Sequence, residues 1–241
     1  MSNAIENITF WAGSVTRTAN SWYQYTSDKW VLDMVHGLTI DLFAIPVQTV
    51  IPDSACRDPN KDAVLKGQID KLLVEGIIET AYHSSRAFVS HMFLRPKSDG
   101  TYRPILNLSE LNECTYYKHF KMDHLVSVMG IIPLGSYMSS IDITQAYHSL
   151  GVKERDRDLL QLQHRGKRFR FTCLPNGYSP GPRIFTRVMK ALMAYLRVEF
   201  GVNLVFYIDD TLIYANSPED VRQAVQNTLD VLQGAGFMIN F

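Results

Sequence analysis

The sequence predicts an α+β fold built on an antiparallel sheet, for three reasons. Residues 139–143, 204–208 and 211–215 are short runs rich in β-branched and aromatic residues, which favour strands. Residues 182–200 place apolar side chains at helical spacing, and Ser217-Pro218 is a strong start for a second helix. With a last strand at 237–241, the order is a β-α-β-β-α-β unit that carries an insertion after its first strand.

Composition limits the class of protein. At 241 residues, 46% hydrophobic and 20% charged, the chain is long enough for one large core or two lobes. No apolar run reaches the roughly 18 residues of a membrane span, and no secretory signal is present, so we expect a soluble intracellular protein without a membrane partner. The cysteines, Cys56, Cys114 and Cys173, and the scattered histidines show no metal-ligand spacing. Nothing indicates an oligomeric state.

The segments before the central unit are predicted in order. Residues 1–60 read as a largely extended N-terminal extension wrapped on the following domain, with a short helix near 27–35 capped by Ser27 or Asp28. Residues 62–75 form a packed helix that Asn60 caps and Gly76 ends. Strands at 88–94 and 101–108 flank a turn at 96–100, and Arg95, Lys97 and Arg103 make this hairpin basic.

The insertion is also predicted to be a basic hairpin. Its strands are residues 159–163 and 168–173, and a loop rich in Pro and Gly follows at 174–182. Residues 153–190 carry ten Lys and Arg against three acids, which suits a polyphosphate or nucleic-acid partner. The alternative is a solvated basic hairpin without a ligand.

Two adjacent acids, Asp209 and Asp210, are the only break between the runs at 204–208 and 211–215, which predicts a hairpin with both carboxylates at its tip. Adjacent carboxylates repel each other, and a hard cation such as Mg²⁺ takes their oxygens as ligands. The alternative is an ordinary polar turn, in which Asp is favoured. In a β-α-β-β-α-β sheet the first strand can lie beside the central hairpin, which would bring Asp142 next to both acids.

Three carboxylates that converge at a sheet edge match the arrangement for in-line phosphoryl transfer with two metal ions. One ion activates the attacking hydroxyl, and the other steadies the leaving oxygen and the phosphates. No side-chain nucleophile is required. The absence of a Ser-His-Asp or Cys-His pattern from the sequence is consistent with this chemistry.

Four motifs in order resemble those of reverse transcriptases. Residues 142–147 resemble the first catalytic motif, residues 174–185 the loop-helix motif, and Tyr207-Ile208-Asp209-Asp210 the third catalytic motif. Residues 95–104, followed by Leu111-Asn112, resemble the fingers hairpin that holds the incoming triphosphate. Four further segments resemble sequences of the DIRS-type retrotransposon branch in particular. They are residues 30–32, 118–122, 182–186 and 236–240.

The resemblance implies a polymerase right-hand fold, with a fingers subdomain and a ferredoxin-like palm. The implied division is an N-terminal extension at 1–60, fingers at 61–117 and 150–180, and palm at 118–149 and 181–241. Since Phe241 precedes the segments that form the thumb in this family, we expect fingers and palm only. Two departures from the pattern are mild: Asn176 stands where the family more often has Gln or Phe, and Gly181 where a small Ser or Ala is common.

The resemblance also implies a role for each matched acid. Asp142 and Asp209 would be the principal ligands of two Mg²⁺ ions, with Mn²⁺ as a substitute, and Asp210 would be the third acid. The implied reaction is synthesis of DNA from dNTPs on a primed RNA or DNA template. The alternative is a truncated, catalytically inactive retroelement remnant that keeps the fold and at most binds nucleic acid or a partner.

The remaining implied roles concern the nucleotide. Lys97 and Arg103 would grip the β- and γ-phosphates, although alone they would be read as a solvated turn. Tyr147 would lie under the sugar and exclude a 2′-hydroxyl, although alone it would be read as a half-buried strand aromatic. Asn176 and Gly177 would flank the nascent base pair.

Overall fold

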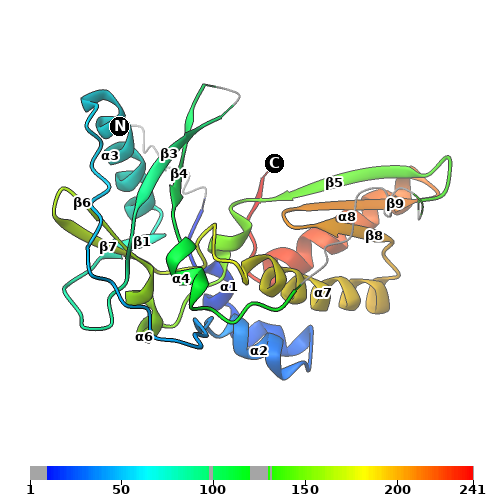
Figure 1. Ribbon diagram of the computed structural model, residues 1–241. Coiled ribbons are helices and arrows are strands. Elements are labelled where there is room, and N and C mark those ends of the chain that lie inside the picture. Colours follow the sequence, from blue (N-terminus) through cyan, green and yellow to red (C-terminus); the bar gives the residue numbers. More distant parts are fainter. Residues whose placement is uncertain (1–9, 98–99, 120–129, 131, 241) are drawn as a thin grey trace, which may run out of the picture.

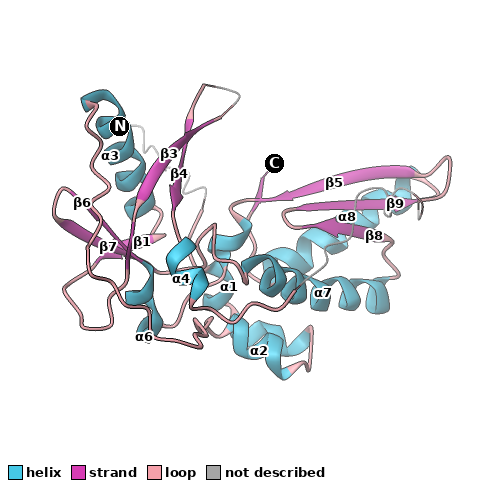
Figure 2. Cartoon of the chain, viewed as in Figure 1, coloured by secondary structure: helices cyan, strands magenta, loops and turns pink. Residues whose placement is uncertain are grey.

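The computed structural model describes residues 10–97, 100–119, 130 and 132–240, whose strands form three sheets (Figures 1 and 2). The sheet that carries the acids is antiparallel throughout and has the strand order β10-β5-β9-β8. Its strands are β5 (Tyr137–Ile143), β8 (Leu204–Tyr207), β9 (Asp210–Ala215) and β10 (Ile239–Asn240). The predicted α+β class and the antiparallel sheet are confirmed.

One face of this sheet is covered, and among the described residues the other is open. Along β5, Ile141 and Ile143 are buried while Asp142 is exposed, as the two-residue period of a strand requires. Two helices cover the buried face, α7 (Gly181–Phe200) and α8 (Pro218–Gly234). Helix α8 begins where predicted, because the side chain of Ser217 accepts a hydrogen bond from Asp220 N at 3.1 Å. The open face is therefore free to present polar groups.

A second lobe holds the other two sheets. The larger has the order β1-β7-β6-β2, from β1 (Ile78–Thr80), β2 (Val89–Ser90), β6 (Gln161–His164) and β7 (Lys167–Phe171). The smaller is the hairpin of β3 (Met92–Pro96) and β4 (Tyr102–Leu106), and helix α3 (Pro59–Val74) packs against β1, β3 and β4. Short helical segments connect these parts: α4 (Ser109–Glu113), η2 (Ala146–Ser149), α6 (Glu154–Arg157) and η3 (Asp158–Leu160).

Two expectations for this lobe are corrected. The single strand expected at 88–94 is two strands, because β2 pairs in parallel with β6 whereas β3 pairs with β4. The N-cap of α3 is Asp58 rather than Asn60: its carboxylate accepts from Asn60 N at 2.9 Å, and Pro59 takes the first helical position. Residues 98–99 of the expected turn and 120–122 of the resemblance lie outside the described residues.

The described part of the N-terminal segment belongs to the core. Helix α2 (Lys29–Val35) is capped by Asp28, as predicted. The expectation of extended chain is wrong for α1 (Ser14–Arg17) and the 3-10 helix η1 (Ala19–Gln24). Within η1, Trp22 is fully buried and its indole Nε1 donates to Ala235 O at 3.0 Å, just beyond α8. This bond therefore fastens η1 to the end of α8.

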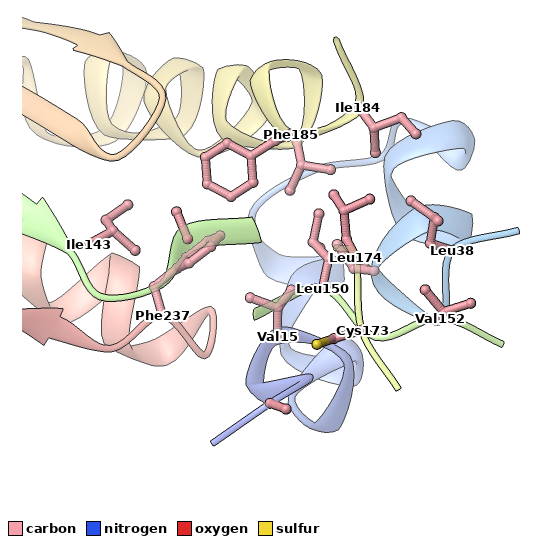
Figure 3. Close-up of a cluster of buried hydrophobic side chains, with 14 of the residues drawn as sticks. Val15, Leu38, Ile143, Leu150, Val152, Cys173, Leu174, Ile184, Phe185 and Phe237 are labelled. Atoms are coloured by element: carbon pink, nitrogen blue, oxygen red, sulfur yellow. The ribbon is translucent and has the colours of Figure 1, made fainter. Parts of the chain in front are cut away.

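Figure 3 shows how the core joins segments that are distant in the sequence. Val15, Leu150 and Phe185 are all fully buried in one cluster with Ile143 and Phe237. Burying each large side chain contributes about 1.5–3 kcal/mol, so the cluster fixes β5, α7 and the turn after β5 relative to one another. None of the helices in the described ranges is long and apolar enough to cross a bilayer.

Candidate active site

The register of the antiparallel sheet aligns four polar residues in one row on the open face. Asn240 pairs with Asp142, Asp142 pairs with Asp210, and Asp210 pairs with Tyr207. All four are exposed. Because directly opposed residues share a face with Cβ atoms about 4.5–5.5 Å apart, the predicted meeting of Asp142 and Asp210 is found.

The tip of the β8–β9 hairpin is Ile208-Asp209, not Asp209-Asp210 as expected, since Tyr207 pairs with Asp210 and Asp210 opens β9. Ile208 has a φ of 57°, in the left-handed region that a β-branched residue rarely enters. A positive φ at the first turn position alone is that of a type II′ turn, which normally has glycine there. Ile143 N donates to Asp209 O at 3.0 Å and ties this tip to β5, beside Asp142.

The acids at this edge influence one another. Partial burial, and then the charges of Asp209 and Asp142, raise the pKa of Asp210. Asp142 Oδ2 accepts a hydrogen bond from Asn240 Nδ2 at 3.0 Å. Within the described ranges no three His, Cys, Asp or Glu side chains already surround a common metal position. The donor set nevertheless fits a hard cation, because mutually repelling carboxylates at one edge are the ligands that Mg²⁺ prefers.

A cavity of about 520 Å³ lies between this edge and the β3–β4 hairpin. Its lining includes five of the residues that the sequence assigned to the site, namely Lys97, Arg103, Tyr147, Asn176 and Asp209. Asp142, Asp210 and Gly177 are not among its lining residues. Helix α3 adds Lys71 and Glu75 to the wall, which sequence reasoning did not identify. The cavity thus sets cationic groups from two elements opposite the acidic hairpin tip.

Tyr147 connects the cavity to the core. It lies in η2, and its ring centroid is 5.2 Å from that of Phe185 in α7. Burial, and then the nearby Asp209 and Tyr207, raise the pKa of the Tyr147 hydroxyl to about 12. The side chain therefore presents a neutral phenol whose ring position is fixed by packing.

The loop that carries Asn176 is fastened to the second lobe by Asn112. The amide Nδ2 of Asn112 donates to Gly177 O at 2.9 Å, and its Oδ1 accepts from Ser179 N at 2.9 Å. Gly177 has a φ of 98°, and a Cβ there would lie 3.3 Å from Leu106 O. Glycine is required at this position by both conformation and space.

Sequence reasoning missed a polar network of Glu75, Gln145 and His148, which line the same cavity as Tyr147. Gln145 Nε2 donates to Glu75 Oε2 at 3.1 Å, and Gln145 Oε1 lies 2.8 Å from His148 Nδ1. Burial lowers the pKa of His148 to about 4, so its imidazole is neutral at pH 7. Gln145 lies within the first motif and His148 directly follows it, so their position could have drawn attention to them, whereas Glu75 gave no signal.

Curated relatives of the chain are polyproteins of retroelements. It is 23% identical over 172 residues to the Pro-Pol polyprotein of Simian foamy virus type 1, covering 71% of this chain and 14% of that protein. It is 23% identical over 179 residues to the retrovirus-related Pol polyprotein from transposon gypsy of Drosophila melanogaster, covering 73% and 17%. The Transposon Tf2-3 polyprotein of Schizosaccharomyces pombe is 24% identical over 182 residues, covering 76% and 13%. The chain spans less than a fifth of the length of these relatives.

Solved structures share the fold. The native Prototype Foamy Virus protease-reverse transcriptase superposes with a TM-score of 0.67 at 20% identity, over 83% of this chain and 26% of that one. The foamy viral protease-reverse transcriptase in complex with dsDNA gives 0.69 at 17% identity, over 84% and 41%. The family profile described as reverse transcriptase (RNA-dependent DNA polymerase) matches residues 95–241, more than half of the chain. The chain therefore belongs to the reverse transcriptase family, the RNA-directed DNA polymerases.

Proposed function

We propose that this chain is the polymerase core of a reverse transcriptase, which extends a primer from deoxynucleoside triphosphates on an RNA or DNA template. One observation carries the proposal. A single cavity is lined by Asp209 of the acidic tip, by the cations Lys97 and Arg103 of the β3–β4 hairpin, and by Tyr147. Opposite charges at the two sides of one cavity suit a triphosphate and its metal ions.

Asp142, Asp209 and Asp210 are proposed as the metal-binding acids. When bound there, two Mg²⁺ ions, or Mn²⁺ in their place, would activate the primer hydroxyl and neutralise charge on the phosphates. The antiparallel register supports this role, because it sets Asp142 opposite Asp210 on the exposed face. The strained turn at Ile208 supports it too, since strain of this kind concentrates at functional sites.

The cavity residues are proposed to bind the nucleotide. Arg103 offers a bidentate fork and Lys97 a point charge to the β- and γ-phosphates. Tyr147, held on Phe185, would lie under the sugar and disfavour a 2′-hydroxyl. Asn176 and Gly177 would flank the new base pair, and the fastening of their loop by Asn112 is consistent with that role.

The subdomain limits remain proposals as well. Residues 61–117 and 150–180 supply the strands of the β1-β7-β6-β2 sheet and the β3–β4 hairpin, which supports their assignment to the fingers. Residues 118–149 and 181–241 supply the other sheet and are assigned to the palm, with 1–60 as an extension. The foamy viral neighbour solved with dsDNA supports a primer–template partner. We also place the chain in the DIRS-type branch, which a tree built with reverse transcriptases of known branches would test.

Triphosphate binding tests the cavity assignment. Lys97→Ala and Arg103→Ala should each weaken binding of dGTP by about 1.5–3 kcal/mol, the contribution of a hydrogen bond to a charged group. Arg95→Ala is the matched control, because Arg95 pairs with Arg103 across the same hairpin but does not line the cavity. Titration calorimetry in Mg²⁺ gives all three affinities. If Lys97→Ala and Arg103→Ala bind dGTP as the unaltered chain does, the cavity is not the triphosphate site.

A further inference from the structure

The side chains of the turn after β5 make two separate sets of contacts, although Gln145, Tyr147 and His148 all line the same cavity. Gln145 directly precedes the 3-10 helix η2 and is hydrogen-bonded to His148. Tyr147 lies within η2 and packs on Phe185. Any constraint on the Gln145 side is therefore transmitted to the Tyr147 ring through one short, stiff turn.

Both the nitrogen and the oxygen of the Gln145 side-chain amide are hydrogen-bonded. We name the network of Glu75, Gln145 and His148 the Gln145 clamp. Gln145 Nε2 donates to Glu75 Oε2, so Gln145 Oε1 is the acceptor and His148 Nδ1 must be the donor. The second oxygen of Glu75 lies 3.7 Å from Lys71 Nζ, and the Glu75 side chain is only 15% exposed. Helix α3 thus anchors the turn from outside the palm sheet.

The backbone of Gln145 adopts an uncommon conformation. Gln145 has a φ of 47° and a ψ of 48°, in the left-handed region that non-glycine residues seldom adopt. Two further backbone bonds fix the turn that follows, from His148 N to Gln145 O at 2.9 Å and from Gly13 N to His148 O at 2.8 Å. The unfavourable conformation of Gln145 is offset by the contacts of its side chain, which glycine could not make.

We propose that Glu75 and Gln145 are positioning residues that hold the ring of Tyr147 at the sugar end of the nucleotide cavity, and so set the preference for deoxyribonucleotides over ribonucleotides. The inference rests on the proposed function, since it takes this cavity as the nucleotide site. Glu75 and Gln145 line the same cavity, and their proposed effect on the Tyr147 ring acts through the turn rather than through contact with the sugar. The clamp thus makes sugar selection depend on a helix of the second lobe.

Gln145→Gly is the decisive variant. Glycine adopts the left-handed conformation freely, so the variant should fold with a melting temperature close to that of the unaltered chain, while both side-chain bonds are lost. The ratio of dGTP affinity to GTP affinity, measured by titration calorimetry in Mg²⁺, should fall about tenfold, the effect of losing one hydrogen bond of about 1.4 kcal/mol. Glu75→Leu should lower the ratio similarly.

A conservative variant and a double variant distinguish positioning of the Tyr147 ring from a general effect on the stability of the fold. Glu75→Gln keeps an acceptor for Gln145 Nε2 and should keep the ratio within about twofold, as expected where a neutral hydrogen bond replaces a charged one. In Tyr147→Ala the ratio should already be low, and adding Gln145→Gly should change it no further, because both act through one ring. Lys66→Ala, which removes an exposed pair with Asp70 on α3, is the control and should leave the ratio unchanged.

The outcomes are distinguishable. A folded Gln145→Gly variant with an unchanged dGTP-to-GTP ratio overturns the positioning role and leaves the proposed function standing. An additive effect of Gln145→Gly on Tyr147→Ala also overturns it, since the clamp would then act elsewhere. An unaltered chain that binds neither triphosphate overturns the proposed function, and the inference with it.

Discussion

Ile208 holds a β-branched side chain in a conformation that suits glycine, at the tip that carries Asp209. The free-energy cost of this conformation is offset by the pairing of Tyr207 with Asp210 and by the hydrogen bond from Ile143 N to Asp209 O. Such strain costs about 1–3 kcal/mol and keeps the acid in place only while the surrounding sheet is intact. Asp209 is therefore held by backbone hydrogen bonds, those of the hairpin and the one from β5.

A comparison of two substitutions at Ile208 isolates this strain. At an ordinary strand position Gly is less stable than Ala by about 0.5–1 kcal/mol, because glycine loses more conformational freedom on folding. At Ile208 the order should be reversed, with Ile208→Gly more stable than Ile208→Ala by about 1 kcal/mol. Urea denaturation of both variants measures the difference. A more stable Ile208→Ala would show that the left-handed turn does not form in solution.

At the residue scale, the sequence indicated which residues come together better than how they are held. Asp142 pairs with Asp210, and Asp209, Lys97 and Arg103 line one cavity. These residues could be selected because acids at strand ends and cations on a turn are visible in one sequence. Asn240, Glu75 and the conformation of Ile208 could not be, because each depends on which distant strand or helix becomes its neighbour. Such information is absent from local spacing.

The β6–β7 turn is an element fixed by one carboxylate from another segment. Asp53 accepts hydrogen bonds from the backbone of Arg165 at 3.0 Å, Gly166 at 2.9 Å and Ala55 at 2.9 Å. Partial burial alone would raise its pKa, but the bonds from Ala55, Gly166 and Arg165 outweigh burial and lower the pKa of Asp53 to about 2. The basic hairpin is thereby held against the chain that precedes α3.

The depressed pKa gives this element a defined pH dependence. A carboxyl whose pKa is lower in the folded state stabilises that state above its unfolded pKa of about 3.9 and loses the effect as the pH falls towards about 2. Asp53→Ala should lower the free energy of unfolding at pH 7 by about 0.5–1.5 kcal/mol, kept small because Asp53 is exposed. Denaturation at several pH values should show the difference vanishing near pH 2. The role of Asp53 would be contradicted if Asp53→Ala lowered the free energy of unfolding equally at pH 2 and pH 7. It would also be contradicted if the exposed control Asp70→Ala lowered that free energy as much.

Elements were predictable where their signals are local. Helix α8 follows from Ser217 and Pro218, and the β8–β9 hairpin follows from its residue types. The division of residues 88–94 into β2 and β3 was not predictable, because a continuous apolar run does not reveal that its halves pair with different strands. The helical turns at 14–24 were missed because their apolar residues face a core built from distant segments.

The whole molecule depends on its N-terminal segment as a structural part. Trp22 is fully buried against Phe237 and donates to Ala235 O, so it joins the start of the chain to the end of α8. The two-lobed right-hand arrangement was predicted from the resemblance, not from periodicity. Local sequence patterns do not predict how the two sheets are arranged around one cavity.

Trp22→Ala tests this structural role. Loss of a buried aromatic side chain of this size should lower the free energy of unfolding by about 3–5 kcal/mol. Trp11→Ala is the control, because Trp11 is 43% exposed and should cost much less. Urea denaturation followed by far-UV circular dichroism measures both. Equal costs for the two variants would mean that Trp22 does not anchor the segment in solution.

The most direct test of the account is incorporation of one nucleotide into a labelled primer on an RNA template with Mg²⁺, for the 241-residue chain and for Asp209→Asn. Asn keeps the side-chain size and removes a charge that repels Asp210, so the variant should stay folded. Under the proposed function the variant loses a metal ligand at the point of phosphoryl transfer, so incorporation should become undetectable while the unaltered chain adds the templated nucleotide. Incorporation by Asp209→Asn at the rate of the unaltered chain, or none by the folded unaltered chain, would contradict the account.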